Sequence, residues 1–200
     1  MWIKICGLAT QPAVEAAVKH GATHIGFVFA PSQRQITPEA AKYLASFVPE
    51  SVQKVGLFVN ADLLTIEQTI ATVGLDMVQL HGQETAAFAD QISVPVMKAF
   101  GIKDGQLPPE LAAFKQHMIL LDAPPTEFAG GSGKIFDWGK VDLTALADYD
   151  FFIAGGLTPD NVAEAITIFQ PTGVDVSSGV ETDGVKDLEK IKLFIEKSKR

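Results

Sequence analysis

The single cysteine of this chain, Cys6, ends an isoleucine-rich segment and is followed at once by Gly7. A thiol at the end of a strand can act as a nucleophile or as a general base, depending on its pKa and its neighbours. Far down the chain, Asp122 ends the apolar run Met118–Asp122, and a carboxyl group placed there can donate a proton. The two residues are therefore a candidate acid–base pair. The simpler alternatives are that Cys6 is a small buried hydrophobe and that Asp122 caps a backbone amide.

Arg34 and His81 are two further candidates, and we expect both to bind the substrate. Apart from Arg200, Arg34 is the one arginine of the chain, and its planar guanidinium suits a two-point clamp on a carboxylate or a phosphate. The alternative is an ordinary solvated loop arginine. His81 could form a nucleophilic pair with Cys6 only from a distance in the sequence. It could equally be a structural histidine that is hydrogen-bonded at the end of a strand.

Two glycine-containing turns predict a phosphate site. Gly155-Gly156 and Ser178-Gly179 each follow an apolar segment near the end of the chain. Glycine lets the backbone approach a ligand closely, and free backbone N–H groups can hold an anion. Each turn alone could simply be a tight connection. Together they match the loops after strands seven and eight, where parallel barrels commonly bind phosphate.

The elements that must position these residues are short apolar segments alternating with amphipathic ones. The apolar segments are each bounded by Gly, Pro, Asn or Asp, which is typical of strands. The eight predicted strands are Trp2–Cys6, His24–Phe29, Gln53–Val59, Asp76–His81, Val94–Ala99, Met118–Asp122, Asp150–Ala154 and Gly173–Ser177. Eight strands alternating with about eight helices predict an α/β fold, a (β/α)₈ TIM barrel, with a doubly wound sheet as the alternative. We expect residues 1–200 to form one barrel domain.

Helical periodicity is clear in three places. Leu63, Ile66, Ile70 and Val73 form one apolar stripe that Gly74 ends. The other two stripes are Val162, Ala165, Ile166 and Phe169, with Thr158 as the expected N-cap and Pro159 at the first helical position, and Val185, Leu188, Ile191 and Ile195. The segment 123–140 contains Gly-Gly-Ser-Gly and predicts a long active-site loop.

Strand parity predicts one buried ionic contact. Side chains alternate along a strand, so Lys4 faces the barrel interior if Cys6 does. Asp175 on the eighth strand would also face inward, and strands one and eight are neighbours in a closed barrel. We therefore expect Lys4 and Asp175 to form a charged network beneath Cys6. The alternative is that Lys4 reaches outward to solvent.

Composition narrows the class of protein. The chain has 200 residues, of which 47% are hydrophobic and 20% charged, which suits one large core. Its net charge of -8 argues against nucleic acid and anionic membrane as partners. One cysteine cannot form an intramolecular disulfide, so we expect a cytoplasmic protein. The composition leaves open whether the protein is a monomer or a homodimer.

Eight short motifs occur in an order that resembles the phosphoribosylanthranilate isomerases of tryptophan biosynthesis. They lie at Lys4–Leu8, Gly26–Phe29 with Ser32–Arg34, Val55–Asn60, Val78–Gly82, Leu120–Asp122, 130–133 with 136–138, Ala154–Leu157 and Asp175–Glu181. The resemblance covers essentially the whole chain. It implies a (β/α)₈ barrel that converts N-(5-phosphoribosyl)anthranilate to 1-(2-carboxyphenylamino)-1-deoxyribulose 5-phosphate by an Amadori rearrangement.

The resemblance also assigns roles to residues. Asp122 would protonate the furanose ring oxygen, Cys6 would remove the C2′ proton, and Arg34 would hold the anthranilate carboxylate. The turns at Gly155, Gly156, Ser178 and Gly179 would bind the phosphate. It implies no cofactor and no metal, with a phosphorylated small molecule as the substrate. The alternatives are another sugar-phosphate barrel enzyme, such as an epimerase or a thiamin-phosphate synthase, and a phosphate-binding barrel without catalysis.

Overall fold

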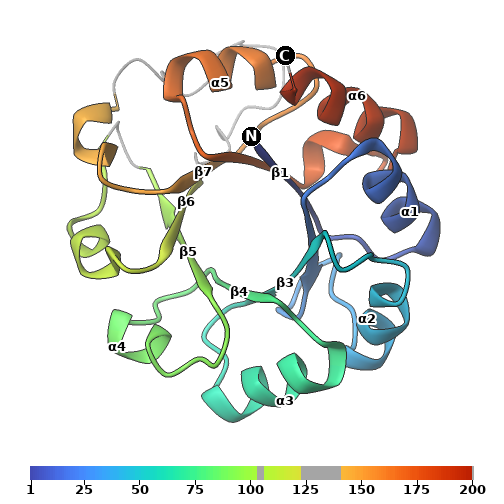
Figure 1. Cartoon of the computed structure of the whole chain (residues 1–200), viewed down its shortest axis with the longest axis horizontal. Helices are drawn as coiled ribbons and strands as arrows, with labels where there is room; N and C mark the ends of the chain where they lie inside the picture. Colours follow the sequence, from blue (N-terminus) through green and yellow to red (C-terminus); the bar gives the residue numbers. More distant parts are fainter. Residues whose placement is uncertain (103–105, 123–140, 200) are drawn as a thin grey trace.

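The computed structural model describes residues 1–102, 106–122 and 141–199. Eight parallel strands close into a barrel in sequence order, with the helices packed around it (Figure 1). The barrel strands are β1 (Trp2–Cys6), β2 (His24–Val28), β3 (Gln53–Phe58), β4 (Met77–Leu80), β5 (Val96–Gly101), β6 (Met118–Asp122), β7 (Phe151–Ala154) and β8 (Gly173–Val176). The predicted (β/α)₈ barrel is confirmed, and the doubly wound sheet is not, because β1 pairs with both β2 and β8.

Helices cover the outside of the barrel. The α-helices are α1 (Gln11–His20), α2 (Pro38–Ala45), α3 (Leu63–Val73), α4 (Ala86–Ala89), α5 (Val162–Phe169) and α6 (Leu188–Ser198). In addition to these six α-helices, the described residues form 3₁₀ helices, so the expectation of about eight helices holds. Between β5 and β6, the described residues form only a short 3₁₀ helix, Pro109–Phe114. Pro108 and Pro109 delay the start of this helix, so that only two helical turns fit before β6. A second 3₁₀ helix, Leu143–Leu146, precedes β7.

The three helical stripes were predicted with unequal accuracy. α3 spans the predicted residues and ends at Gly74, which has a φ of 72°. α5 begins at Val162 with Asn161 as its N-cap, so the predicted start at Thr158 and Pro159 was wrong. The cause is a turn that precedes the helix, in which the Thr158 N–H donates to Asn161 Oδ1 at 2.7 Å.

The last helix also begins later than predicted. Val185 was expected on its apolar face but is 66% exposed and belongs to a hairpin. α6 starts at Leu188, with the Asp187 side chain as its N-cap, and buries Ile191 and Ile195 as predicted. Leu188 itself lies on the exposed side.

The hairpin consists of β9 (Glu181–Thr182) and β10 (Val185–Lys186), which pair antiparallel. Asp183 and Gly184 form its two-residue turn with φ angles of 52° and 78°. Positive φ at both positions is the signature of a type I′ turn, which Asp-Gly favours. The turn sets the register, so that Lys186 lies directly opposite Glu181.

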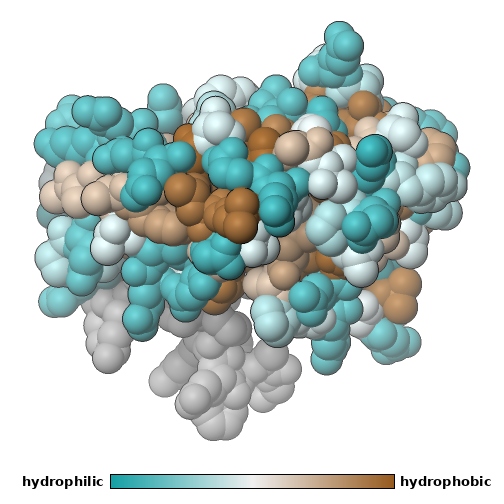
Figure 2. Space-filling model, turned by 90° about the horizontal axis from the view of Figure 1, so that it is seen from below, coloured by the Kyte–Doolittle hydropathy of each residue, from teal (hydrophilic) through white to brown (hydrophobic). Residues whose placement is uncertain are grey.

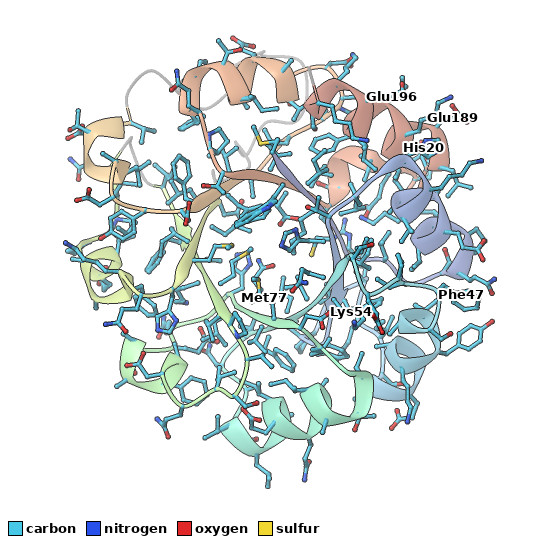
Figure 3. The ribbon with its side chains drawn as sticks, viewed as in Figure 1. His20, Phe47, Lys54, Met77, Glu189 and Glu196 are labelled. Carbon is cyan, nitrogen blue, oxygen red and sulfur yellow. The ribbon has the colours of Figure 1, made fainter. Side chains whose placement is uncertain are left out.

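Two apolar layers surround the strands. Side chains that point into the barrel form one cluster, which includes Met77, Met97, Leu120 and Phe152, and Figure 3 shows Met77 directed toward the centre of the ring. A larger cluster fills the space between strands and helices. Because the strands are parallel and closely registered, their carboxyl ends converge at one mouth of the barrel.

One side of the molecule is mainly hydrophilic. In Figure 2, hydrophilic side chains spread across the face below the view of Figure 1, with hydrophobic residues showing between them. Within the described residues, no helix combines the length and the apolar character needed to cross a membrane.

Candidate active site

A cavity of about 420 Å³ opens at the carboxyl ends of the barrel strands. All eight residues singled out from the sequence line it, which brings together positions from one end of the chain to the other. They are Cys6, Arg34, His81, Asp122, Gly155, Gly156, Ser178 and Gly179. Leu57, Gln79, Leu120 and Ala154 also contribute to its wall.

Cys6 lies deep in this cavity and is only 4% exposed. It fits because its neighbour on β2 is glycine: a Cβ at Gly26 would lie 2.9 Å from the Cys6 Sγ. Burial raises the pKa of the Cys6 thiol, and the nearby Lys4 ammonium lowers it in part. The thiol is therefore mostly protonated at neutral pH in the free protein, with a cation beside it that favours the thiolate.

The ionic contact predicted beneath Cys6 is confirmed. Lys4 is completely buried, and its Nζ donates to Asp175 Oδ1 at 3.0 Å. Burial opposes the charge on this ammonium, but Asp175 and Cys6 outweigh it and raise the pKa of Lys4 above its ordinary value. A permanent positive charge therefore lies directly under the thiol.

Asp122 at the end of β6 contacts His81 rather than standing alone. His81 Nε2 lies 3.3 Å from Asp122 Oδ2, and the other ring nitrogen of His81 lies 3.4 Å from the amide nitrogen of Gln79. If Gln79 donates to Nδ1, the proton of a neutral His81 is on Nε2, where it points at the carboxylate. In this arrangement the Nε2–H group of His81 faces the Asp122 carboxylate, so the two side chains form one pair.

Arg34 is held in a bidentate ion pair, which the sequence did not indicate. Its Nε and Nη2 atoms donate to the two carboxylate oxygens of Glu181, each at 2.6 Å. The side chain is 30% exposed and lines the cavity. It is not an ordinary solvated loop arginine.

Lys186 completes this cluster. Its Nζ donates to Glu181 Oε1 at 2.6 Å and to the Ser177 carbonyl at 2.8 Å. Burial works against the Glu181 carboxylate, but the hydrogen bonds from Arg34 and Lys186 hold its pKa below the usual range. The sequence did carry a signal for the Glu181–Lys186 part of this cluster, because Asp183-Gly184 predicts a hairpin that sets these two residues face to face.

The two glycine-containing turns lie against each other. Gly155 and Gly156 have φ angles of 85° and 64°, which L-residues with a side chain rarely adopt. Gly179 packs so tightly that a Cβ there would overlap the carbonyl oxygen of Leu157. The loops after β7 and β8 thus form one wall of the cavity, with backbone exposed along it.

The described residues contain no group of three or more His, Cys, Asp or Glu side chains arranged to hold a metal ion. The predicted glycine-rich loop at 123–140 lies outside the part of the chain that the structure describes.

The barrel and its cavity define a class of protein: a (β/α)₈-barrel enzyme with a thiol, a carboxyl group and two glycine-containing loops at the mouth. The family model for N-(5'-phosphoribosyl)anthranilate (PRA) isomerase matches residues 3–197. The chain belongs to this family, which confirms the resemblance seen in the sequence.

Individual relatives agree over the full length. The N-(5'-phosphoribosyl)anthranilate isomerase of Listeria welshimeri is 51% identical over 199 residues, which is 100% of this chain and 98% of the relative. The crystal structure of the phosphoribosyl anthranilate isomerase from Thermotoga maritima aligns with a TM-score of 0.90 at 38% identity, over 100% of this chain and 98% of that one. Another phosphoribosyl anthranilate isomerase structure, at 35% identity and a TM-score of 0.87, contains reduced 1-(o-carboxyphenylamino)-1-deoxyribulose 5-phosphate and aligns over 100% of this chain and 98% of that one.

Proposed function

We propose that the chain catalyses the Amadori rearrangement of N-(5-phosphoribosyl)anthranilate in tryptophan biosynthesis, with Asp122 as general acid and Cys6 as general base. The family membership supports the reaction. The observation that supports the two roles is that Cys6 and Asp122, from β1 and β6, line the same cavity. The whole chain, residues 1–200, serves as one catalytic domain in this proposal, and its reduced cysteine suits the cytoplasm.

The first step opens the sugar ring. The Asp122 carboxyl group donates its proton to the furanose ring oxygen, the bond from C1′ to that oxygen breaks, and the anthranilate nitrogen supplies the electron pair that forms an iminium. His81 Nε2, at 3.3 Å, then stabilises the Asp122 carboxylate that this transfer leaves. The iminium formed in this step is part of the substrate and serves as the electron sink for the step that follows.

The second step removes a proton from carbon. The Cys6 thiolate takes the C2′ proton, and the electrons of that bond neutralise the iminium to give an enolamine. Loss of the enol proton and protonation of C1′ then give the ketone product. Cys6 becomes a neutral thiol and forms no bond to the substrate. Lys4 stabilises the thiolate before the transfer, because its ammonium is fixed beneath the sulfur.

The two ends of the substrate bind on different sides of the cavity. In this proposal the guanidinium of Arg34 holds the anthranilate carboxylate, and the backbone of Gly155, Gly156, Ser178 and Gly179 holds the sugar phosphate. These two contacts fix the substrate at both ends. The reacting C1′ and C2′ atoms then lie between the acid and the base, which is the positioning that such catalysis requires.

Steady-state kinetics with freshly made phosphoribosylanthranilate test the two roles, following the loss of substrate fluorescence. We expect Asp122→Asn and Cys6→Ala each to lower kcat by about 10²- to 10⁴-fold, since each variant removes a proton-transfer group. Asp90→Asn is a matched control, because Asp90 also pairs with a histidine, His117, at 2.9 Å but lies outside the cavity.

A folded wild-type protein without turnover would contradict the reaction itself. A decrease of less than about tenfold in either variant would contradict the role of that residue alone. Circular dichroism of each variant establishes that the fold is intact before the rates are compared.

A further inference from the structure

The guanidinium of Arg34 has only part of its hydrogen-bonding capacity left. Of its five N–H donors, Glu181 takes the one on Nε and one on Nη2 in a parallel pair. A guanidinium bound along this edge offers its other edge, Nη1 and Nη2, to a second carboxylate. Glu181 therefore fixes both the plane of the group and the edge that remains available.

The charge of this cluster depends on Lys186. Glu181 alone would neutralise Arg34, but its Oε1 atom also accepts from Lys186 Nζ at 2.6 Å. The cluster of two cations and one carboxylate thus keeps a net positive charge. The side chains of Glu181 and Lys186 are 7% and 6% exposed, so water screens this charge weakly.

The surrounding backbone holds the cluster in place. The type I′ turn sets Glu181 opposite Lys186, and the Lys186 ammonium is also bound to the Ser177 carbonyl at the end of β8. On the other side, the Arg34 Cδ would lie 2.5 Å from a Cβ at Gly7, so the arginine packs directly on the backbone after Cys6. The arginine side chain is therefore confined between the Glu181–Lys186 hairpin on one side and the backbone at Gly7 on the other.

We propose that Glu181 and Lys186 are positioning residues that aim the free edge of Arg34 into the cavity, where it selects substrates that carry an aromatic carboxylate. Of these three residues, Arg34 lines the cavity, whereas Glu181 and Lys186 do not. The two residues therefore act through Arg34 and not on the substrate directly. This inference rests on the proposed function, because it assigns the substrate carboxylate to Arg34.

Binding of a matched ligand pair tests the inference. The two probes are reduced 1-(o-carboxyphenylamino)-1-deoxyribulose 5-phosphate and the same compound without its carboxyl group, each titrated by calorimetry. We expect the wild-type protein to bind the carboxylated probe at least about tenfold more tightly, as for a charge-assisted hydrogen-bonded pair. Glu181→Gln and Lys186→Met should each lose most of this ratio, and their affinity for the probe without the carboxyl group should change by less than about twofold.

Kinetics and a double variant add a second measurement. Glu181→Gln should raise KM with little change in kcat, since it affects binding and not proton transfer. Lys186→Met should also raise KM, with a small decrease in kcat because the Lys186 charge lowers the pKa of the Cys6 thiol. In an Arg34→Met background, Glu181→Gln should have almost no further effect on KM, because the residue through which it acts is gone. Glu189→Gln and Lys192→Met, from an exposed ion pair on α6, are the matched controls and should leave both probes unaffected. Glu189 is visible on the outer side of that helix in Figure 3.

Each outcome decides between explanations. A ratio that stays at the wild-type value in Glu181→Gln or in Lys186→Met would overturn the inference, and either variant suffices if the other does not fold. Tighter binding of the carboxylated probe by Glu181→Gln would also overturn it, since Glu181 would then act only by neutralising Arg34. If the wild-type protein bound both probes equally, Arg34 would not be the carboxylate site. If it bound neither, the proposed function would fail first.

Discussion

At the scale of single residues, the chemistry of Cys6 depends on a lysine that solvent does not reach. Lys4 is completely buried and paired with Asp175. Of these two charges, Lys4 has the larger effect on the thiol, and it lowers the pKa that burial has raised. A buried ion pair adds little net stability to a fold. Its position under Cys6 instead suggests that it serves the thiolate.

We predict that the double variant Lys4→Met/Asp175→Asn will lose activity while staying folded. Without the ammonium, the pKa of the Cys6 thiol rises further, so the limb of the kcat/KM profile that rises with pH should move to higher pH. At a fixed pH below the pKa, each unit by which the pKa rises should lower kcat/KM tenfold, because the thiolate fraction falls tenfold. A pH–rate profile between pH 6 and 10 measures both.

The single variant Lys4→Met tests how the ion pair affects the stability of the fold. It leaves the Asp175 carboxylate buried without its cation and should lower the free energy of unfolding by about 3–5 kcal/mol. Removing the exposed pair Lys197 and Asp160, whose atoms lie 3.1 Å apart, serves as the control and should cost less than about 1 kcal/mol. An unchanged pH profile in the double variant would show that Lys4 does not assist Cys6.

At the scale of elements, the loops after β7 and β8 build one wall of the cavity together. Gly179 permits this, since its backbone lies against the Leu157 carbonyl with no room for a side chain. The Asn161 side chain holds the same region by donating to the Gly156 carbonyl at 3.0 Å. The proposed phosphate site therefore depends on the contact between two loops, and neither loop suffices alone.

We predict that Gly179→Ala will weaken phosphate binding. The added methyl group must push the two loops apart, so the backbone groups of the β7 loop and the β8 loop can no longer meet one phosphate. KM should rise by about tenfold, as for the loss of one charge-assisted hydrogen bond, with a smaller effect on kcat. Inorganic phosphate as a competitive inhibitor measures the site directly. Gly101→Ala is the control, because Gly101, like Gly179, does not have a positive φ, but it lies outside the cavity at the end of β5, where an added Cβ would meet nothing within 4 Å.

At the scale of the whole molecule, the two ends of the barrel have different tasks. The carboxyl ends of the strands carry the cavity. Toward the opposite end, Trp2, His24 and Phe152 pack together, with His24 and Phe152 edge to face at 5.3 Å. His24 is 4% exposed, and burial together with the Lys4 charge lowers its pKa to about 4. This end therefore contributes to stability.

We predict that acid destabilises the fold through His24. In the unfolded chain the histidine binds a proton near pH 6.5, whereas in the folded barrel it stays neutral until about pH 4. The stabilisation is therefore complete above pH 6.5 and is lost as the pH falls toward 4, by about 3 kcal/mol in all. Urea unfolding between pH 4 and 7 measures this slope.

His24→Gln should flatten that slope without changing kcat at pH 7, because His24 lies outside the cavity. His20→Gln is the matched control, since it removes a histidine from the end of α1 on the outside of the barrel (Figure 3), and it should keep the wild-type slope. An unaltered slope in His24→Gln would assign the acid sensitivity to other groups.

Local patterns in the sequence were sufficient for the barrel and for eight of the residues that line the cavity. Each strand is a short apolar run ended by a turn residue, so its position depends on neighbours in the chain and could be predicted to within two residues. The alternation of side chains along each strand also predicted the contact between Lys4 and Asp175, because inward-facing positions on adjacent strands must meet. The start of α5 and the exposure of Val185 were missed, since a turn and a hairpin competed there with helical periodicity.

The sequence by itself determined which residues reach the mouth of the barrel, because strand ends in a closed parallel barrel converge wherever the strands lie along the chain. Only the tertiary structure decided what each residue contacts there. Arg34 pairs with Glu181, and His81 with Asp122, across 147 positions in the first case. Such contacts depend on side-chain directions between loops that are distant in the sequence, and no local pattern encodes them.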